Sequence, residues 1–449
     1  MNGVSVSRII SKNYKNLRLE EGIDLGALTV LIGANGSGKS NVISLLQFLQ
    51  ESLIGPGVED RRGRTNFEDA IFRLGGTRIL DANLDAPANV GIEFQFDIRG
   101  ERSTLGIELL VQEPRRPIIL NREFLVQESN QPEGIEKQFA HPAGNRTGPP
   151  IYYSMHNGED GGRGYGVVTI VPRELDLVEA PLPFLLKIQD VPVNELALSA
   201  MPRFLEDTLY PSEMVAIYGP RGKILDSSIT WKFYHANNMN LEKIRLSDPK
   251  LGQSDTYVSP TGENLALVVF NLIQDEFEFD DLLNATIKDF LPKLRRMRAL
   301  PLGRYALTIE WYVEGCSEPF FLSEMSDGTV RMLCWAVILH SPKLPRLIVI
   351  DEPELGIHPA WMPILADWIK KAAHRTQVIV TTHSPDLLDH FTDQLDDGYV
   401  YVFQEDTECQ SHFNPKRLDC DNVSGWLEDG WQLGDLYRVG NPAVGGWPW

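Results

Sequence analysis

The chain has 449 residues, of which 43% are apolar and 9% aromatic, and a formal net charge of −20. The apolar content is enough to bury a core, which excludes a disordered chain, and the length fits one large domain with insertions or two domains. The acidic balance argues against a dedicated nucleic-acid binder, which usually carries the opposite charge, but it leaves room for a local basic groove.

The cysteines and the apolar runs bear on the compartment. No two of the four cysteines form a C-x-x-C pair, which argues against a zinc ribbon, and so few cysteines fit a reducing cytosol. The first residues lack an apolar signal core, and no apolar run reaches the roughly 18 residues that a membrane-spanning helix needs. We therefore expect a cytoplasmic protein with no membrane partner.

Residues 1 to 55 predict two strands, a loop and a helix. The segment "VSVSRII" alternates in polarity, and Leu28–Ile32 is a compact apolar run that ends at a glycine. After the loop, apolar residues recur at i, i+3, i+4 and i+7, which is typical of one buried helix face. The residues of this face are Val42, Leu45, Leu46 and Leu49.

The loop between this strand and this helix has the spacing of a phosphate-binding P-loop, G-x-x-x-x-G-K-S. Glycines let the backbone wrap around phosphate oxygens and aim N–H groups at them. Lys39 would place its charge at the β- and γ-phosphates, the Ser40 hydroxyl would complete a Mg²⁺ shell, and the N-terminal end of the helix would face the phosphates. The alternative, a chance glycine turn, fits the strand-loop-helix context poorly. The predicted nucleotide-binding residues are Gly33, Asn35, Gly36, Ser37, Gly38, Lys39, Ser40 and Asn41.

The middle of the chain is less informative. The runs "VGIEFQFDI", "STLGIELLV" and "PIILNREFLV" are spaced like antiparallel hairpins. Residues 128–166 are rich in Gly, Pro and Asn without a period, which predicts a long surface loop, and residues 175–260 are mixed. From Gly262 a helical period returns, and the strand-type runs "RYALTIEWYV", "PRLIVIDEP" and "QVIVTTH" alternate with helical ones. This order favours a parallel sheet covered on both faces.

Two carboxylates follow the second of these runs. Leu347–Ile350 is a short apolar run, typical of a central parallel strand, and it would deliver Asp351 and Glu352 to the carboxyl end of the sheet, where such sheets bind ligands. Asp351 suits the Mg²⁺ shell, and Glu352 suits a general base that orients the attacking water. An ordinary polar strand end is the alternative, which the P-loop disfavours.

The next strand-type run, "QVIVTTH", ends at His383, and Ser-Pro then opens a helix. An imidazole there could contact a γ-phosphate near pH 7. A lone histidine is more often a structural hydrogen-bonding group, but its place at the end of the strand after the Asp-Glu pair favours the phosphate contact.

The stretch "SEMSDGTVRMLCWAVIL" places a serine and a glycine at the start of a helix. An apolar face at helical spacing follows it, made of Val330, Leu333, Cys334, Val337 and Ile338. A helix N-terminus with these residues is an anion site, although they would form a plain N-cap equally well. Because the P-loop already serves the chain's own nucleotide, we expect Ser326 and its neighbours to serve the nucleotide of another subunit.

Together these motifs resemble the ABC-type ATPase head, in the branch shared by the RecF, structural-maintenance-of-chromosomes (SMC) and overcoming-lysogenization-defect (OLD) families. They look most like the prokaryotic AAA-domain ATPases with "SDGT" and "DEPE-x-G-x-HP" motifs. The resemblance covers residues 1–55 and 255–400. It makes Gly33–Ser40 the Walker A motif, Asp351 and Glu352 the Walker B motif, and His383 the switch histidine. It assigns the signature to Ser326, Asp327, Gly328 and Thr329, and the D-loop to Leu355–His358, with Gly356 and His358.

The resemblance implies two heads that dimerise head to tail around two ATP molecules with Mg²⁺, joined by ATP binding and released by hydrolysis. It implies an α/β P-loop NTPase with a mixed or parallel core sheet, an antiparallel β lobe and an inserted helical or mixed region. The expected divisions are an N-terminal ATPase lobe (1–127), an inserted region (128–258), a C-terminal ATPase lobe (259–400) and a tail (401–449).

The sequence departs from the family pattern at several points. The signature reads Ser-Asp-Gly-Thr, and Asp327 brings a negative charge near phosphate, while His358 stands where transporter heads carry Asp. We locate no Q-loop glutamine and no sustained heptad pattern for a coiled-coil arm. Only 66 residues follow His383, too few for a C-terminal TOPRIM nuclease domain. Tyr14, before the P-loop strand, either stacks on adenine or packs in the core.

These features predict an ATP-hydrolysing nucleotide switch, the ATPase subunit of a prokaryotic anti-phage defence or toxin-type system that controls a separate effector protein. The alternative is a RecF-like DNA repair or replication ATPase, because "LPKLRRMRALPLGR" and "EDRRGR" are basic, although such runs are usually solvated faces. An ATP-gated scaffold or a P-loop kinase would leave Glu352 without a role. The tryptophan-rich tail from Trp431 to Trp449 is either a partner-docking strip or a segment packed on the sheet edge.

Overall fold

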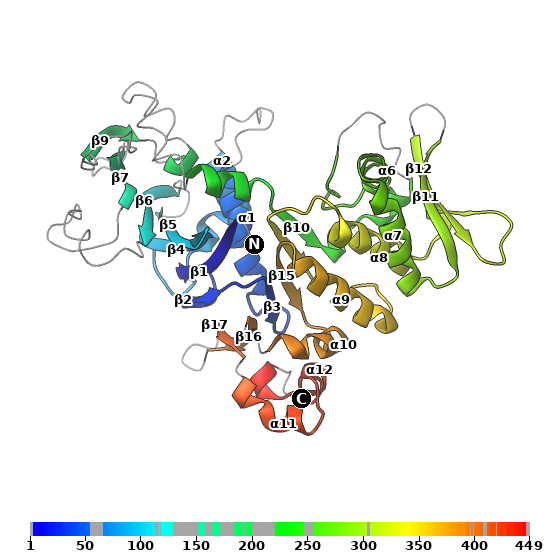
Figure 1. The fold of residues 1–449 in the computed structure, drawn as a ribbon. Helices are drawn as coiled ribbons and strands as arrows, with labels where there is room; N and C mark the ends of the chain where they lie inside the picture. Colours follow the sequence, from blue (N-terminus) through cyan, green and yellow to red (C-terminus); the bar gives the residue numbers. More distant parts are fainter. Residues whose placement is uncertain are drawn as a thin grey trace, which may run out of the picture. The chain divides into compact units, whose positions relative to one another are not determined.

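The computed structural model describes most of the chain. The described residues are 3–53, 66–112, 116, 118–128, 151–157, 164–170, 184–191, 194–199, 221–246, 255–302, 306–395, 397, 399–406, 411–418 and 420–445. The chain divides into two compact units (Figure 1), each of which is described by itself. Unit one consists of Met1–Leu25, Gly36–Trp231 and Gln404–Pro415, and unit two of Gly26–Asn35, Lys232–Phe403 and Lys416–Trp449.

Unit one is built on antiparallel strands. The elements are β1 (Val4–Tyr14), β2 (Leu17–Asp24), α1 (Lys39–Leu53), α2 (Asn66–Leu74), η1 (Gly76–Ile79), β4 (Ala88–Ile98), β5 (Glu101–Val111), β6 (Ile119–Glu128), β7 (Ile151–Asn157), β8 (Gly164–Ile170) and β9 (Phe184–Val191). The strands lie in the order β2-β1-β4-β5-β6-β7-β8-β9. Side chains alternate between the two faces of a strand, and Val90, Ile92 and Phe94 of β4 are all fully buried on one face. The three hairpin-like runs are thus confirmed as antiparallel neighbours.

One expectation for unit one is corrected, and one helix had not been predicted. The predicted loop over residues 128–166 contains β7 and the start of β8, because "IYYSMHN" is rich in strand-forming side chains that the surrounding glycines and prolines masked. The rest of that stretch lies outside the described residues. The polar, glycine-rich stretch after α1 contains α2, whose Phe67, Ala70 and Ile71 are buried at helical spacing. Phe67 packs edge-to-face on Phe48 of α1, with ring centroids 6.1 Å apart.

Unit two contains a parallel sheet whose strands lie in the order β10-β14-β15-β3-β16. These strands are β10 (Lys232–His235), β14 (Leu347–Asp351), β15 (Gln377–Thr382), β3 (Leu28–Ile32) and β16 (Val400–Glu405), which runs on into unit one. Every residue of β3, β14 and β15 is buried, as expected for central parallel strands. The prediction of a parallel sheet is therefore confirmed, and the carboxyl ends of these strands share one edge.

The helices of unit two pack on this sheet and on one another. They are α5 (Leu241–Leu246), α6 (Leu265–Asp275), α7 (Phe277–Phe290), α8 (Asp327–His340), α9 (Met362–Ala373), α10 (Pro385–Leu388), α11 (Ser424–Glu428) and α12 (Leu433–Arg438). The short 3₁₀ turns are η3 (Ala236–Asn238), η4 (Leu322–Glu324), η5 (Pro359–Trp361), η6 (Asp389–Gln394), η7 (Cys420–Asn422) and η8 (Pro442–Val444). The predicted apolar face of α8 is buried, but so are Met332, Trp335 and Leu339 on its other sides. This helix lies within the core, packed against α7 and α9.

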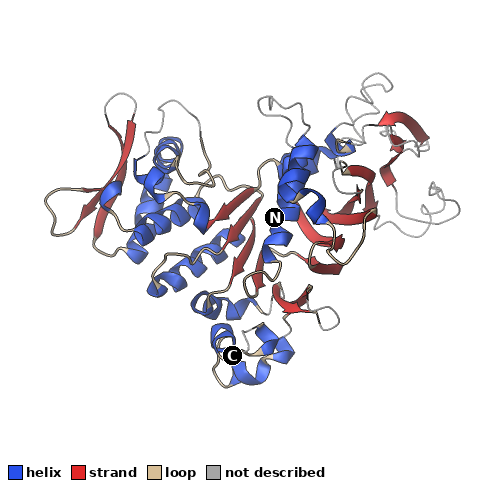
Figure 2. Ribbon diagram, turned by 180° about the vertical axis from the view of Figure 1, so that it is seen from behind, coloured by secondary structure: helices blue, strands red, loops and turns tan. Residues whose placement is uncertain are grey.

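The run "RYALTIEWYV" does not join the parallel sheet, contrary to the expectation from the alternating order. It forms β12 (Ala306–Val313), which pairs antiparallel with β11 (Leu294–Leu302) and β13 (Phe320–Phe321). Only alternate residues of β12, Leu307, Ile309 and Trp311, are buried, which suits a sheet with one solvated face. Figure 2 shows these strands beside the helices, apart from the larger set of strands.

The C-terminal segment packs back on unit two. Arg438 of α12 binds Asp386 and Asp389, at 2.6 and 2.8 Å, and Asp435 of its own helix. Trp431 is partly exposed, whereas Trp447 and Trp449 lie outside the described residues. The described residues thus form an α/β fold with a large mixed sheet and a separate small antiparallel sheet. Among the described residues, no helix is long and apolar enough to cross a membrane.

Candidate nucleotide site

The P-loop begins at the carboxyl edge of the parallel sheet in unit two. Thr382 at the end of β15 lies in register with Ile32 at the end of β3. Gly33, Ala34 and Asn35 follow Ile32 directly and belong to the same unit. The first P-loop residues therefore leave the sheet beside the end of the strand that precedes His383.

The second half of the P-loop belongs to unit one, where α1 begins at Lys39. Gly36 and Gly38 have φ values of 82° and 95°, in the left-handed region that favours glycine. A Cβ on Gly38 would lie 2.5 Å from Cδ2 of Leu17, whereas one on Gly36 would meet nothing within 4 Å. The Ser37 hydroxyl oxygen is buried and has no hydrogen-bond partner. An open backbone turn beside an unpaired buried hydroxyl fits a phosphate-binding loop.

The turn between β1 and β2 supports this half of the P-loop. The sequence did not indicate this support. Lys15 Nζ donates to Asn41 Oδ1 at 3.1 Å, and the Asn16 amide donates to the carbonyl of Gly36 at 3.3 Å. Asn41 in turn donates to Asn16 Oδ1 at 2.8 Å. Tyr14 is fully buried, with its hydroxyl 2.8 Å from Ser44 Oγ, so it packs in the core rather than offering a face to adenine.

Asp351 lies at the end of β14 between two polar neighbours on adjacent strands. The Thr381 hydroxyl of β15 donates to Asp351 Oδ1. On the other side, Nε2 of His235 at the end of β10 lies 3.4 Å from Asp351 Oδ2. Neither neighbour was predicted. Carboxylate oxygens are ligands that Mg²⁺ prefers, and these two contacts leave lone pairs on both oxygens, so the donor set fits this ion.

Glu352 adopts a backbone conformation that is rare for a residue with a side chain. Its φ is 52°, and its N–H donates to the Thr381 carbonyl at 3.1 Å and to the Thr381 hydroxyl at 3.3 Å. Such strain is often stored at functional sites. Here it accompanies a carboxylate whose Oε1 lies 3.2 Å from Nδ1 of His383. The structure thus brings together Glu352 and His383, the two residues predicted for catalysis.

A buried third carboxylate, Glu354, supports this pair. Its Oε1 accepts a hydrogen bond from the Thr382 hydroxyl at 2.6 Å and one from the His383 backbone N–H at 3.3 Å, while Oε2 has no partner. Burial raises the pKa of Glu354, while the hydrogen bond from Thr382 and the charge of His383 act in the opposite direction. Glu354 therefore ties the end of β14 to the end of β15, and the folded state favours its neutral form.

Replacing Glu354 with glutamine should remove a pH-dependent loss of stability. Because the pKa is raised on folding, the carboxyl group contributes stability below its ordinary value of 4.5, and this is lost as the pH rises through the folded-state pKa. Glutamine keeps an acceptor for Thr382 and does not titrate. The melting temperature of Glu354→Gln should exceed that of the native chain by about 2 °C or more at pH 8, with a smaller gap at pH 4. A difference in melting temperature that does not change with pH would refute the effect of burial on Glu354. The same pH-dependent difference in the exposed Glu428→Gln control would also refute it.

The residues predicted as the signature, Ser326 to Thr329, lie at the N-terminus of α8, the place expected for them. Ser326 is the N-cap: its Oγ accepts from the Thr329 N–H at 3.3 Å and lies 2.8 Å from the Thr329 hydroxyl. The negative charge of Asp327 is matched by Arg245 of α5, whose Nη2 lies 2.6 Å from Asp327 Oδ1 and also donates to the Met325 carbonyl. Arg245 was not predicted to take part in the site. Its positive charge offsets the negative charge of Asp327, the residue that departs from the family pattern.

The segment Leu355–His358, predicted as the D-loop, lies directly against α8. A Cβ on Gly328 would lie 3.2 Å from the Gly356 carbonyl oxygen, and a Cβ on Gly356 would lie 2.9 Å from Nε of Arg331. His358 caps the following turn by accepting the Ala360 N–H at 3.1 Å, and its ring is exposed. A side chain at position 328 would crowd the Gly356 carbonyl, whereas Gly356 has a φ of 72°, in the left-handed region that favours glycine.

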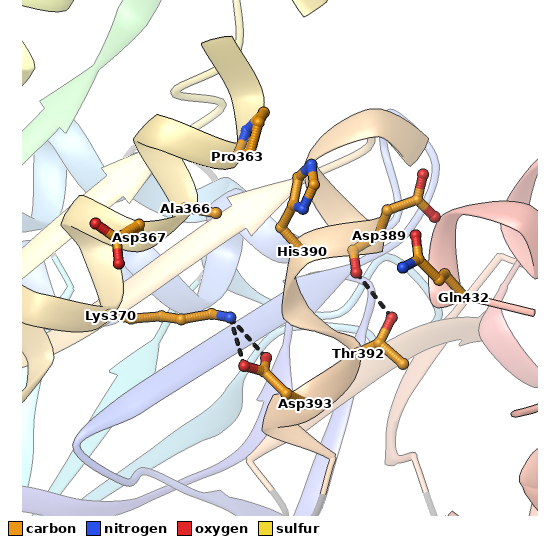
Figure 3. A pocket seen from close by; sticks show the side chains of 9 residues that line it. All are labelled: Pro363, Ala366, Asp367, Lys370, Asp389, His390, Thr392, Asp393 and Gln432. Atoms are coloured by element: carbon orange, nitrogen blue, oxygen red, sulfur yellow. Dashed lines mark hydrogen bonds and ion pairs between the residues drawn. The ribbon is translucent and has the colours of Figure 1, made fainter. Parts of the chain in front are cut away.

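A separate pocket of about 490 Å³ lies between α9, η6 and Gln432. Figure 3 shows its lining, in which Lys370 reaches both carboxylate oxygens of Asp393, at 2.7 and 2.6 Å. The lining residues are Pro363, Ala366, Asp367, Lys370, Asp389, His390, Thr392, Asp393 and Gln432. It shares no residue with the P-loop, the Walker B motif, the signature or the switch histidine.

Comparisons with known proteins identify the family. Residues 28–389 match the family described as "AAA domain, putative AbiEii toxin, Type IV TA system". A segment of 97 residues, 22% of this chain, is 32% identical to "ABC transporter A family member 8" of Arabidopsis thaliana and spans only 10% of that protein.

Among solved structures, the chain is similar to an SMC head bound to the C-terminal winged-helix domain of ScpA. The TM-score is 0.47 and the identity 12%, over 93% of this chain and 99% of that one. The SMC head domain from Thermotoga maritima gives a TM-score of 0.41 and 13% identity, over 92% and 99%. Because the family match covers well over half of the 449 residues, the chain belongs to this AAA-domain family of P-loop ATPases.

Proposed function

We propose that the chain binds and hydrolyses ATP with Mg²⁺ and works as a nucleotide switch. The observation that carries this proposal is the pair of Glu352 and His383 at neighbouring strand ends, with Glu352 Oε1 3.2 Å from His383 Nδ1. The register of Thr382 with Ile32 sets this pair beside the first P-loop residues, Gly33 to Asn35. A carboxylate held beside an imidazole at such an edge suits the activation of water next to a terminal phosphate.

Each predicted residue has a role in this proposal. The P-loop backbone and Lys39 would hold the phosphates, and Ser40 and Asp351 would hold Mg²⁺, which would supply positive charge to neutralise the phosphates. Glu352 accepts a proton from the attacking water, and His383 donates a hydrogen bond to the terminal phosphate. Glu354 keeps the His383 backbone in place through its two hydrogen bonds.

We further propose that two chains dimerise head to tail, with Ser326–Thr329 of one chain against the nucleotide of the other. Support comes from the exposed Ser326 and Asp327 at the N-terminal end of α8, where the charge of Asp327 is offset by Arg245. Gly356, which lies against the same helix, and the exposed His358 two residues further on would form part of that contact. The position of the chain in the RecF and OLD branch and its division at residues 127, 258 and 400 belong to the same proposal.

The biological role we favour is that of a cytoplasmic ATPase subunit that controls a separate effector in an anti-phage or toxin-type system. The family description, which names a toxin of a Type IV toxin-antitoxin system, supports this direction. The alternative, a RecF-like DNA-binding ATPase, finds support in Arg295, Arg296 and Arg298, which lie exposed on β11. Arg296 pairs with Asp280, however, and Arg298 lies over Tyr312. The cluster "EDRRGR" lies outside the described residues.

The proposal is tested by ATP binding and phosphate release of the native chain and of Lys39→Ala. The native chain should hydrolyse ATP only with Mg²⁺, and the variant should lose binding because the charge that faces the phosphates is gone. Equal activity in both chains would contradict the proposal. Co-purification of a second polypeptide from the native host would support the effector role, whereas stimulation of hydrolysis by DNA at low salt, lost at high salt, would favour the alternative.

A further inference from the structure

His235, a residue without a role so far, lies at the Walker B edge of the sheet. His235 of β10, Asp351 of β14 and Thr381 of β15 form one row, because each is the register partner of the next across three adjacent parallel strands. Side chains at paired positions of parallel strands project to the same face. The row therefore sets an imidazole and a hydroxyl on either side of the Asp351 carboxylate.

The hydrogen bonds of the imidazole define which nitrogen carries the proton. Nδ1 of His235 accepts the backbone N–H of Asn237 at 3.0 Å, so in the neutral ring the proton lies on Nε2. Nε2 lies 3.4 Å from Asp351 Oδ2 and thus presents a donor to it. The capped turn η3 fixes the direction of the ring and of this N–H group.

The backbone around His235 is held from a third element. Arg331 of α8 donates through Nη1 to the carbonyl of Ala236, the residue after His235. This anchor comes from the helix that begins at the signature, and the same guanidinium lies against Gly356. The strand β10, the hydrogen bond from Asn237 and the bond from Arg331 to Ala236 therefore fix the position of the His235 ring.

We infer that His235 is a positioning residue that orients the Asp351 carboxylate toward Mg²⁺, an inference that rests on the proposed function. Thr381 binds one carboxylate oxygen and His235 faces the other, which restricts rotation of the group while leaving lone pairs for the ion or its water. Groups that orient metal-binding side chains in this way typically change metal affinity by about 10- to 100-fold when they are removed. His235 thereby affects the affinity of the site for the metal ion. It leaves the affinity for the nucleotide in the absence of the ion unchanged.

The experiment compares His235→Phe, which keeps a flat ring without the donor, with His235→Gln, which keeps an N–H donor. Electron paramagnetic resonance measures Mn²⁺ affinity in the presence of a non-hydrolysable ATP analogue, and calorimetry measures analogue affinity in EDTA. We expect His235→Phe to bind Mn²⁺ about tenfold more weakly or worse, with unchanged analogue affinity in EDTA. His235→Gln should recover part of the loss, and the exposed His374→Phe should behave as the native chain.

Native Mn²⁺ affinity in His235→Phe would overturn the inference. So would an equal loss of analogue affinity in EDTA, because that result would mean that His235 merely supports the fold. If the native chain bound the analogue neither with Mn²⁺ nor in EDTA, the proposed function would fail first, and this inference with it.

Discussion

The Glu352→Gln variant is expected to bind ATP while releasing phosphate at least about 100-fold more slowly than the native chain. Glutamine matches the shape of glutamate but cannot accept the proton of the attacking water. The strained backbone at φ 52° and the bonds from its N–H to Thr381 do not involve the side chain, so they should survive the exchange. The ATP-bound state would then accumulate, and light scattering should give twice the mass of the chain when ATP and Mg²⁺ are present.

Two controls accompany this measurement. Lys39→Ala, added to Glu352→Gln, should keep the single-chain mass with ATP, because the nucleotide is no longer held. Glu428→Gln, an exposed exchange in α11, should leave hydrolysis unchanged. A mass that does not change when ATP is added would mean either that the assembly is permanent or that Ser326–Thr329 do not bind a partner's nucleotide. In the second case these residues would be an ordinary helix cap. Undiminished hydrolysis would exclude Glu352 as the base.

The sequence predicted the central strands well because they are locally encoded. Leu28–Ile32 agrees with β3 at both ends, and the Asp-Glu pair and His383 follow strands that the apolar runs already marked. Apolar runs of this kind have a single stable place, the middle of a sheet covered on both faces. Once the strands are parallel, their carboxyl ends share an edge, and the residues after them gather there without further information.

The supporting residues could not be predicted in the same way, because their partners lie far away in the chain. Asp327 and Arg245 are 82 positions apart, and the contact depends on where α5 lies against η4 and α8. His235 ends a strand of only four residues, and nothing in the sequence says that this strand pairs with β14. Glu354 looks like an ordinary polar residue, and only burial beside Thr382 gives it a role. Tertiary packing, rather than local pattern, selects these groups.

The proposed contact of the signature with a partner's nucleotide can be tested by introducing a bulky side chain at Ser326 in the Glu352→Gln background. Ser326→Phe should keep its own P-loop and bind ATP, but it should remain a single chain, because an aromatic ring would fill the space in front of α8. Ser326→Ala is the matched control, since it removes the cap bonds to Thr329 at a cost of about 1 kcal/mol without adding bulk. Ser326→Ala should therefore still double its mass with ATP.

Mixing two variants then distinguishes the loss of a contact between subunits from a structural defect within one chain. In a head-to-tail pair, each nucleotide lies between the P-loop of one chain and the signature of the other. Ser326→Phe and Lys39→Ala chains, each inert alone, should form one intact site when mixed, using the P-loop of the first and the signature of the second. With different tags on the two chains, ATP should make one tag capture the other. Dimers of Ser326→Phe alone, or no capture in the mixture while Ser326→Ala dimerises, would mean that α8 does not face a partner's nucleotide.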